Sequence, residues 1–327
     1  MADVVQLTSR EEQARRLAEA LKRQLGPLLC AVLAEPGVVD LMLNADGTVW
    51  ADRLGRGMAP VGRMSATAAE AFVGTVASTM RATITRENPI LDCELPAAPP
   101  FLGARFAAMV PPVTAAPVFA IRLKASSVFP LQEYERQGIT SASQRAAVEA
   151  AIRERRNILV VGSTGSGKTT LTNAVIAYMV EVAPGHRLLI MEDTGELQCT
   201  AKNALIQRAT DGADMQRLLK AAMRFRPDRI IVGEVRDGAA LALLKAWNTG
   251  HPGGACTIHA NDARAGLTRL EQLIAEVSQN PMQPVIAEAV DLIVSIAKAD
   301  NEPGRIVREV VAVRGFAGGS YQLETLE

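Results

Sequence analysis

Apolar residues in the first part of the chain follow helix spacing and strand spacing in turn. Leu17, Leu21 and Leu25 recur every four residues and predict an amphipathic helix over residues 10–25. Further elements are predicted as strands over 38–43 and 48–50, a helix over 65–82, and extended runs over 105–110 and 118–123. We therefore expect a small α+β domain over residues 1–130.

The pattern changes after a stretch of weak periodicity. Residues 131–141 contain Gly138 and Ser141 and have the composition of a linker. Ser141 and Gln144 then form a capping-box pattern that predicts a helix through Arg155. Apolar runs that predict buried strands follow at 157–161, 187–191, 229–232, 254–258 and 292–297. Strands this apolar are typical of a sheet that is covered on both faces, so an α/β domain is expected over 142–327.

Composition supports two soluble domains and argues against a nucleic-acid partner. The chain has 327 residues, enough for about two domains. Its 35 basic and 35 acidic side chains cancel, and the pI is near 6.9. Binding to a phosphate backbone ordinarily needs a positive field, so we expect no direct sequence-specific binding of nucleic acid.

The chain shows no pattern of export or membrane insertion. Its amino terminus lacks a basic segment followed by a long apolar one, and no run approaches 18 uncharged apolar residues. The four cysteines are widely spaced and form no Cys-x-x-Cys pair, which is typical of reduced thiols in the cytosol. We expect a cytoplasmic protein, and a peripheral position on a membrane complex remains open.

The strongest chemical motif follows the first predicted strand of the second domain. Residues 162–169 read Gly-Ser-Thr-Gly-Ser-Gly-Lys-Thr and match the phosphate-loop pattern G-x-x-x-x-G-K-[ST] in full. Such a loop turns its N–H groups toward phosphates at the start of a helix, with Lys168 reaching the β- and γ-phosphates and Thr169 binding Mg²⁺. The sequence thus predicts a site for ATP and Mg²⁺ formed by Gly162, Ser163, Thr164, Gly165, Ser166, Gly167, Lys168, Thr169 and Thr170.

Polar residues at three other strand ends complete the candidate site. Glu192 and Glu234 each follow an apolar strand, and His259 follows a third. One acid after a strand is more often a solvated loop residue, and one histidine there is more often a packing or capping residue. Nucleotide hydrolysis, however, needs a carboxylate for the magnesium shell and another to orient water. Two acids behind a phosphate loop therefore favour the catalytic interpretation.

These motifs, in this order, resemble those of the secretion ATPases of type II and type IV systems. The resemblance covers the phosphate loop, an aspartate box at 191–197, an atypical Walker B motif at 226–236 and a histidine box at 250–264. Residues 40–50 and 121–124 also resemble the amino-terminal domain of that family. Within it, the chain looks most like the conjugal-transfer and type IV secretion members. The resemblance implies a carboxy-terminal RecA-like P-loop NTPase domain behind a smaller α+β domain.

The resemblance also implies roles for individual residues. Glu234 takes the Walker B place and shares Mg²⁺ with Thr169, Glu192 activates water, and His259 senses the γ-phosphate. Arg105 and Arg122, from the amino-terminal domain, would contact the triphosphate; the alternative is that both are ordinary surface charges on strands. The family further implies a homo-hexamer that works with inner-membrane components of a secretion or conjugation complex and is peripherally associated with that membrane.

Three rival functions remain open from the sequence. A pilus-retraction or type II secretion motor would use the same chemistry in another machine. A DNA-translocating RecA-type motor would bind DNA strongly, which a neutral chain does not favour. A nucleotide-gated assembly scaffold would bind ATP with negligible turnover, and the presence of both Glu192 and Glu234 argues against it.

Overall fold

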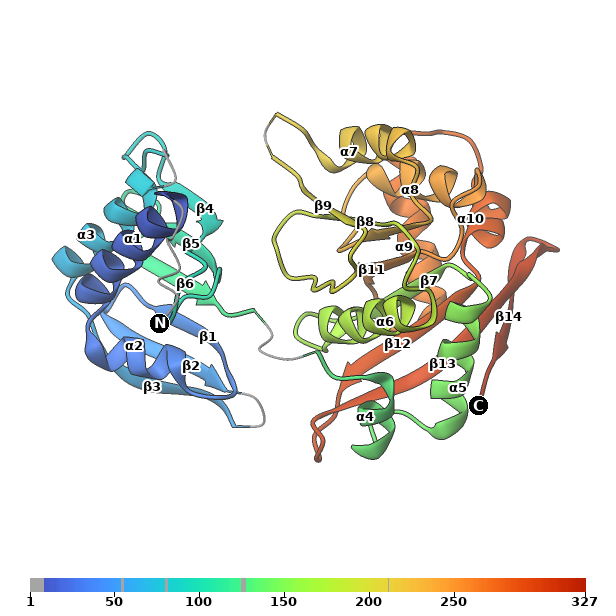
Figure 1. The fold of residues 1–327 in the computed structure, drawn as a ribbon, viewed down its shortest axis with the longest axis horizontal. Coiled ribbons are helices and arrows are strands. Elements are labelled where there is room, and N and C mark those ends of the chain that lie inside the picture. Colours follow the sequence, from blue (N-terminus) through green and yellow to red (C-terminus); the bar gives the residue numbers. More distant parts are fainter. Residues whose placement is uncertain (1–8, 54–55, 80–81, 125–127, 211) are drawn as a thin grey trace, which may run out of the picture. The chain divides into compact units, whose positions relative to one another are not determined.

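A computed structural model describes residues 9–53, 56–79, 82–124, 128–210 and 212–327 of the chain. The chain divides into two compact units, residues 1–126 and residues 127–327. Each unit is built on its own sheet (Figure 1).

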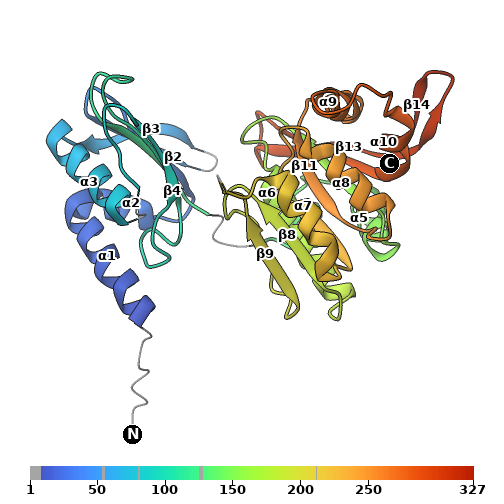
Figure 2. The same ribbon diagram turned by 90° about the horizontal axis from the view of Figure 1, so that it is seen from above.

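The first unit is an antiparallel sheet with helices on one face. The strand order is β3-β2-β1-β6-β5-β4. Leu21, Phe72 and Phe106 are fully buried between this sheet and the helices, while no helix formed by the described residues of this unit covers the opposite face (Figure 2). The elements are α1 Ser9–Leu25, α2 Pro27–Ala34, β1 Val38–Leu43, β2 Thr48–Arg53, β3 Gly57–Arg63, α3 Ala66–Thr79, β4 Ile90–Glu94, β5 Arg105–Met109 and β6 Val118–Arg122.

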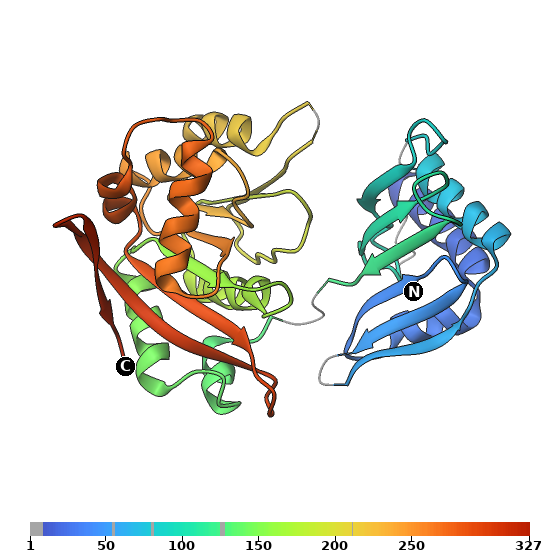
Figure 3. The same cartoon turned by 180° about the vertical axis from the view of Figure 1, so that it is seen from behind.

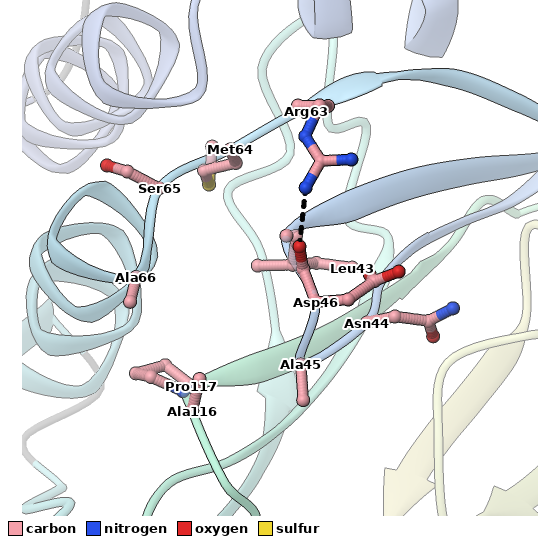
Figure 4. A pocket seen from close by; sticks show the side chains of 11 residues that line it. Leu43, Asn44, Ala45, Asp46, Arg63, Met64, Ser65, Ala66, Ala116 and Pro117 are labelled. Carbon is pink, nitrogen blue, oxygen red and sulfur yellow. Dashed lines mark hydrogen bonds between the residues drawn. The ribbon is translucent and has the colours of Figure 1, made fainter.

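The turn between β1 and β2 lines a pocket of about 410 Å³ in this unit (Figure 4). Arg63 reaches across from the end of β3 and donates a hydrogen bond of 2.8 Å to the carbonyl of Asp46. Gly47 has φ +82, and a Cβ there would lie 2.8 Å from the carbonyl oxygen of Met64, so this turn requires glycine. The pocket is thus the product of a tight hairpin turn.

The second unit is an eight-stranded mixed sheet in the order β14-β13-β12-β7-β11-β10-β8-β9. The run from β12 to β9 is parallel, and β13 and β14 extend it as an antiparallel hairpin (Figure 3). The strands are β7 Ile158–Gly162, β8 Leu188–Glu192, β9 Ala204–Arg208, β10 Arg229–Val232, β11 Ala255–His259, β12 Leu292–Lys298, β13 Arg305–Ala317 and β14 Ser320–Thr325.

Helices cover both faces of this sheet, which explains its continuous apolar strands. Along β7, Ile158 and Val160 pack against one layer, and Leu159 and Val161 pack against the other. The first layer contains α4 Leu131–Arg136, α5 Ala142–Arg153 and α6 Lys168–Val182. The second contains α7 Met215–Ala222, α8 Ala239–Asn248, α9 Ala263–Ala275 and α10 Gln283–Ala289.

A buried guanidinium ties the amino-terminal ends of these strands together. Arg229, at the start of β10, is 1% exposed and donates hydrogen bonds to the carbonyls of Gly253 (2.8 Å) and Ile152 (2.9 Å). Its Nε lies 3.2 Å from Nδ1 of His186. Burial lowers the pKa of Arg229 to about 10, and the nearby cation Arg155 adds to that effect. Burial, reinforced by the charge of Arg229, also lowers the pKa of His186, which favours the neutral acceptor form.

The predicted mixed α/β fold is confirmed: an antiparallel amino-terminal sheet precedes a mixed carboxy-terminal sheet. All five strands predicted for the second unit are present, and the Ser141–Gln144 capping box begins α5 as expected. One boundary differs. Residues 131–141 were expected to be a linker, but they contain α4, and Leu131, Tyr134 and Ile139 are buried in the core of the second unit. That unit therefore begins earlier, at residue 127.

Candidate nucleotide site

The phosphate loop connects β7 to α6 and is wound so tightly that it needs its glycines. A Cβ on Gly162 would lie 2.3 Å from the carbonyl oxygen of Ile296 and 2.4 Å from Oγ of Ser166. Gly165 and Gly167 have φ +71 and +101, in the left-handed region that favours glycine. Gly167 is also the N-cap of α6 and has no side chain to occupy the helix end. The loop therefore offers a backbone cradle that fits phosphate groups.

The side chain of Lys168 folds back onto the phosphate loop and donates hydrogen bonds to its carbonyls. Its side chain is buried, and its Nζ donates to the carbonyls of Gly162 (2.9 Å) and Ser163 (3.0 Å). The same Nζ lies 3.2 Å from Nδ1 of His259. Burial lowers the pKa of Lys168, and the charge of Glu234 opposes that shift. The ammonium group is thus already held at the mouth of the loop.

The other residues of the predicted loop differ in exposure. Ser163, Thr164 and Gly165 are exposed, and Thr170 is half-buried at the start of α6. The Oγ atom of Ser166 is buried and has no hydrogen-bond partner within the described part of the chain.

Glu234 and His259 form a second part of the site. Oε1 of Glu234 lies 3.0 Å from Nε2 of His259, and its Oε2 accepts a hydrogen bond of 2.9 Å from Arg236. Burial lowers the pKa of His259, although the Glu234 carboxylate opposes this. Arg236 also lies 3.7 Å from Asp193, so it connects the loops that follow β10 and β8.

Glu192 and Glu196 form the third part, at the end of β8. Glu192 is 2% exposed, and its Oε2 accepts hydrogen bonds from the backbone N–H groups of Glu196 (2.8 Å) and Leu197 (2.9 Å). This fixes the following loop, and Oε2 of Glu196 accepts a hydrogen bond of 3.2 Å from Thr169. Glu192 therefore reaches the phosphate loop through Glu196.

Sheet topology explains why residues so far apart in sequence meet here. In the register of the parallel strands, His259 pairs with Gly162 and Met191 pairs with Val232. The carboxyl ends of β7, β8, β10 and β11 thus share one edge of the sheet, which is where open α/β sheets bind ligands. At these strand ends Lys168 contacts His259, which contacts Glu234, and Thr169 is linked to Glu192 through Glu196. The catalytic and binding roles of these residues stay predictions.

Sequence reasoning missed Glu196 and Arg236 as members of this site. Both lie inside motifs that the sequence displays, in the loops directly after Glu192 and Glu234. The usable signal was charge: Glu196 is an acid four residues after Glu192, and Arg236 is the first base after Glu234. Their contacts with Thr169 and Asp193 could not be read from spacing alone.

Arg105 and Arg122 belong to the first unit, and the phosphate loop belongs to the second. They are direct cross-strand neighbours on β5 and β6. Arg105 pairs with Asp92 at 2.7 Å, and Arg122 pairs with Asp40 at 2.9 Å. Their contact with a nucleotide stays a prediction.

Comparison with known proteins identifies the family. The model of the type II/IV secretion system protein family matches residues 77–305. The chain is 53% identical over 310 residues to the probable conjugal transfer protein TrbB of Sinorhizobium fredii, covering 95% of this chain and 94% of that one. This chain belongs to the type II/IV secretion ATPase family. The expected resemblance is confirmed.

Two solved structures show the same fold. The Legionella pneumophila ATPase DotB matches with a TM-score of 0.64 at 19% identity, covering 95% of this chain and 83% of that one. The pilus retraction motor PilT with bound ADP matches with a TM-score of 0.61 at 20% identity, covering 91% and 82%. Among the described residues, none of the helices has both the length and the apolar character needed to cross a membrane.

Proposed function

We propose that this protein is an ATP-hydrolysing motor of a conjugal-transfer or type IV secretion apparatus. The observation that carries the proposal is the contact of Lys168, inside a complete phosphate loop, with His259 and through it with Glu234. The identity of 53% to a conjugal transfer protein over nearly the whole chain supports the type of machine. The ADP held by the PilT structure supports a nucleotide as ligand.

The phosphate loop and its neighbours would hold Mg-ATP. Backbone N–H groups of residues 163–169 bind the β- and γ-phosphates, and Lys168 turns from the carbonyls of Gly162 and Ser163 to the phosphate oxygens. Thr169 and Glu234 would hold Mg²⁺, because hydroxyl and carboxylate oxygens are its preferred ligands. When bound, Mg²⁺ neutralises charge on the phosphate oxygens.

Glu192, Glu234 and His259 take separate tasks in hydrolysis. Glu192 orients the attacking water and accepts its proton, from a position fixed by the N–H groups of Glu196 and Leu197. His259, between Lys168 and Glu234, would respond to the γ-phosphate, since the oxygens of that group would accept hydrogen bonds from Lys168 and the accompanying Mg²⁺ would bind Glu234.

Arg105 and Arg122 would complete the site when the two units close. A guanidinium group pairs bidentately with phosphate oxygens and stays charged at all working pH values. Each arginine must first leave its aspartate, Asp92 or Asp40. These exposed ion pairs are worth about 0–1 kcal/mol, so exchanging a carboxylate for a triphosphate is energetically accessible. ATP binding and product release would thereby move one unit against the other.

The active form would be a homo-hexamer on the cytoplasmic face of the inner membrane, docked to membrane components of the apparatus. A ligand bound near a subunit interface stabilises the assembly by mass action. Light scattering should therefore show six subunits, with Mg-ATP increasing that population. A monomer at micromolar protein and saturating nucleotide would contradict the hexamer.

Steady-state phosphate release tests the proposed activity. If the protein is a motor, the full chain should release phosphate from ATP in a Mg-dependent way. Tight ATP binding without turnover would instead identify a nucleotide-gated scaffold. Strong salt-sensitive binding of DNA would indicate a DNA-translocating motor.

A further inference from the structure

Two cations of the β12–β13 hairpin lie against the phosphate loop. Lys298 ends β12, Arg305 begins β13, and the two are direct cross-strand partners. A Cβ built on Gly165 would lie 3.3 Å from Nζ of Lys298, and one built on Gly167 would lie 2.8 Å from Nη1 of Arg305. Both side chains therefore reach two glycines of the loop from a segment more than 100 residues away in the sequence.

These cations have no anionic partner in the described part of the chain: neither side chain forms an ion pair or a hydrogen bond with any of those residues. Their position is electrostatically unfavourable by itself, because the N-terminus of α6 carries a partial positive charge of its own. Two cations and a helix N-terminus at one place form a surface that an anion would stabilise.

The strand order indicates which part of a nucleotide this surface meets. Glu192 and Glu234 follow β8 and β10, and both strands lie on the same side of β7 as β11. The β12–β13 hairpin lies on the opposite side of β7. If the γ-phosphate faces the acids and the β-phosphate sits in the loop, the α-phosphate and the nucleoside continue toward Lys298 and Arg305.

An unsatisfied hydroxyl lies on this same side. Tyr134 of α4 is 3% exposed, and its hydroxyl has no hydrogen-bond partner among the described residues. Burial raises the pKa of Tyr134, and the charge of Arg305 opposes that rise. A buried polar atom without a partner is uncommon and calls for an explanation.

We propose that Arg305 and Lys298 bind the nucleoside end of the nucleotide, with Arg305 on the α-phosphate. The proposal rests on the proposed function, because it takes the phosphate loop as the ATP site. It makes the β12–β13 hairpin part of that site. The two cations then hold ATP and ADP equally, since both ligands carry the α-phosphate.

Equilibrium binding to variants of the full chain tests this. The probes are ADP, a non-hydrolysable ATP analogue and pyrophosphate, and the variants are Arg305→Ala, Arg305→Lys and Lys298→Ala. Arg308→Ala is the matched control, since Arg308 is an exposed arginine of the same strand. In Arg305→Ala, the loss of one charge-assisted hydrogen bond should weaken the binding of ADP and of the ATP analogue by about tenfold each. Arg305→Lys should recover part of that loss, Lys298→Ala should show a smaller loss, and Arg308→Ala should bind as wild type.

Pyrophosphate separates a contact from a supporting role. It can occupy the β and γ positions without a nucleoside, so its competition should be unchanged in Arg305→Ala. If pyrophosphate binding to Arg305→Ala is weakened as much as ADP binding, Arg305 only shapes the loop. If only the binding of the ATP analogue is weakened, Arg305 contacts the γ-phosphate. Either result, or unchanged ADP binding, overturns the inference. Retained ADP binding in Lys168→Ala would instead refute the phosphate loop as the nucleotide site.

Discussion

Replacing Glu192 by glutamine separates two tasks of this buried side chain. Its Oε2 accepts two backbone N–H groups, those of Glu196 and Leu197. Glutamine keeps an oxygen acceptor of the same shape but loses the charge, and neutral hydrogen bonds are about half as strong as charge-assisted ones. The loss is about 1–2 kcal/mol for the two bonds. For a unit of this size, that lowers Tm by about 2–8 °C.

The effect on turnover should be far larger than this loss of stability. Removing a general base typically lowers the rate by about 10²–10⁴-fold, which is about 3–5 kcal/mol of barrier. We therefore expect Glu192→Gln to lower kcat at least about a hundredfold while the Kd of ATP changes by less than about twofold. Phosphate release gives kcat, and binding of fluorescent ATP gives Kd. A variant that keeps more than about a tenth of wild-type kcat would show that Glu192 only anchors the loop.

Three further predictions address other parts of the account. Glu234→Gln should lose turnover and also weaken Mg-ATP binding, because a magnesium-shell carboxylate acts in the ground state too; ATP dissociation constants equal to those of Glu192→Gln would contradict this assignment. Arg105→Ala or Arg122→Ala should lower kcat strongly with Tm nearly unchanged, and unaltered kcat would return both residues to ordinary surface charges. The pKa of His186 is lower in the folded chain than in the unfolded chain, so folding favours its neutral form. The stability that this adds to the fold is fully present above about pH 6.5, the unfolded pKa, and is lost as the pH falls through the folded pKa. Thermal melts from about pH 7 to pH 5 should therefore fall less in His186→Gln than in wild type, and an equal fall would refute the link.

Much of the second unit could be predicted from sequence because its signals are local. The strands β7 and β10 are short apolar runs, and the phosphate loop is a contiguous motif between a strand and a helix. The capping box of α5 is likewise readable from Ser141 and Gln144. Each of these features depends on neighbours within a few residues.

The missed features depend on contacts between distant segments. The strands β9, β13 and β14 were not predicted: charged residues interrupt the apolar pattern of β13, and β9 and β14 are short and contain polar residues. The helix α4 lies in a stretch of linker composition and is stabilised by burial of Leu131 and Tyr134 in the core. Arg305 reaches the phosphate loop only because β13 pairs with β12, which in turn pairs with β7.

Turnover by the Lys168→Ala variant tests the central claim most directly. The control is Lys220→Ala, which removes an exposed lysine of α7 in the same unit. Steady-state phosphate release is measured for wild type and both variants at saturating Mg-ATP. The account predicts that Lys168→Ala keeps its fold and loses turnover, while Lys220→Ala remains active. Retention of more than about a tenth of wild-type turnover by a folded Lys168→Ala protein would contradict it.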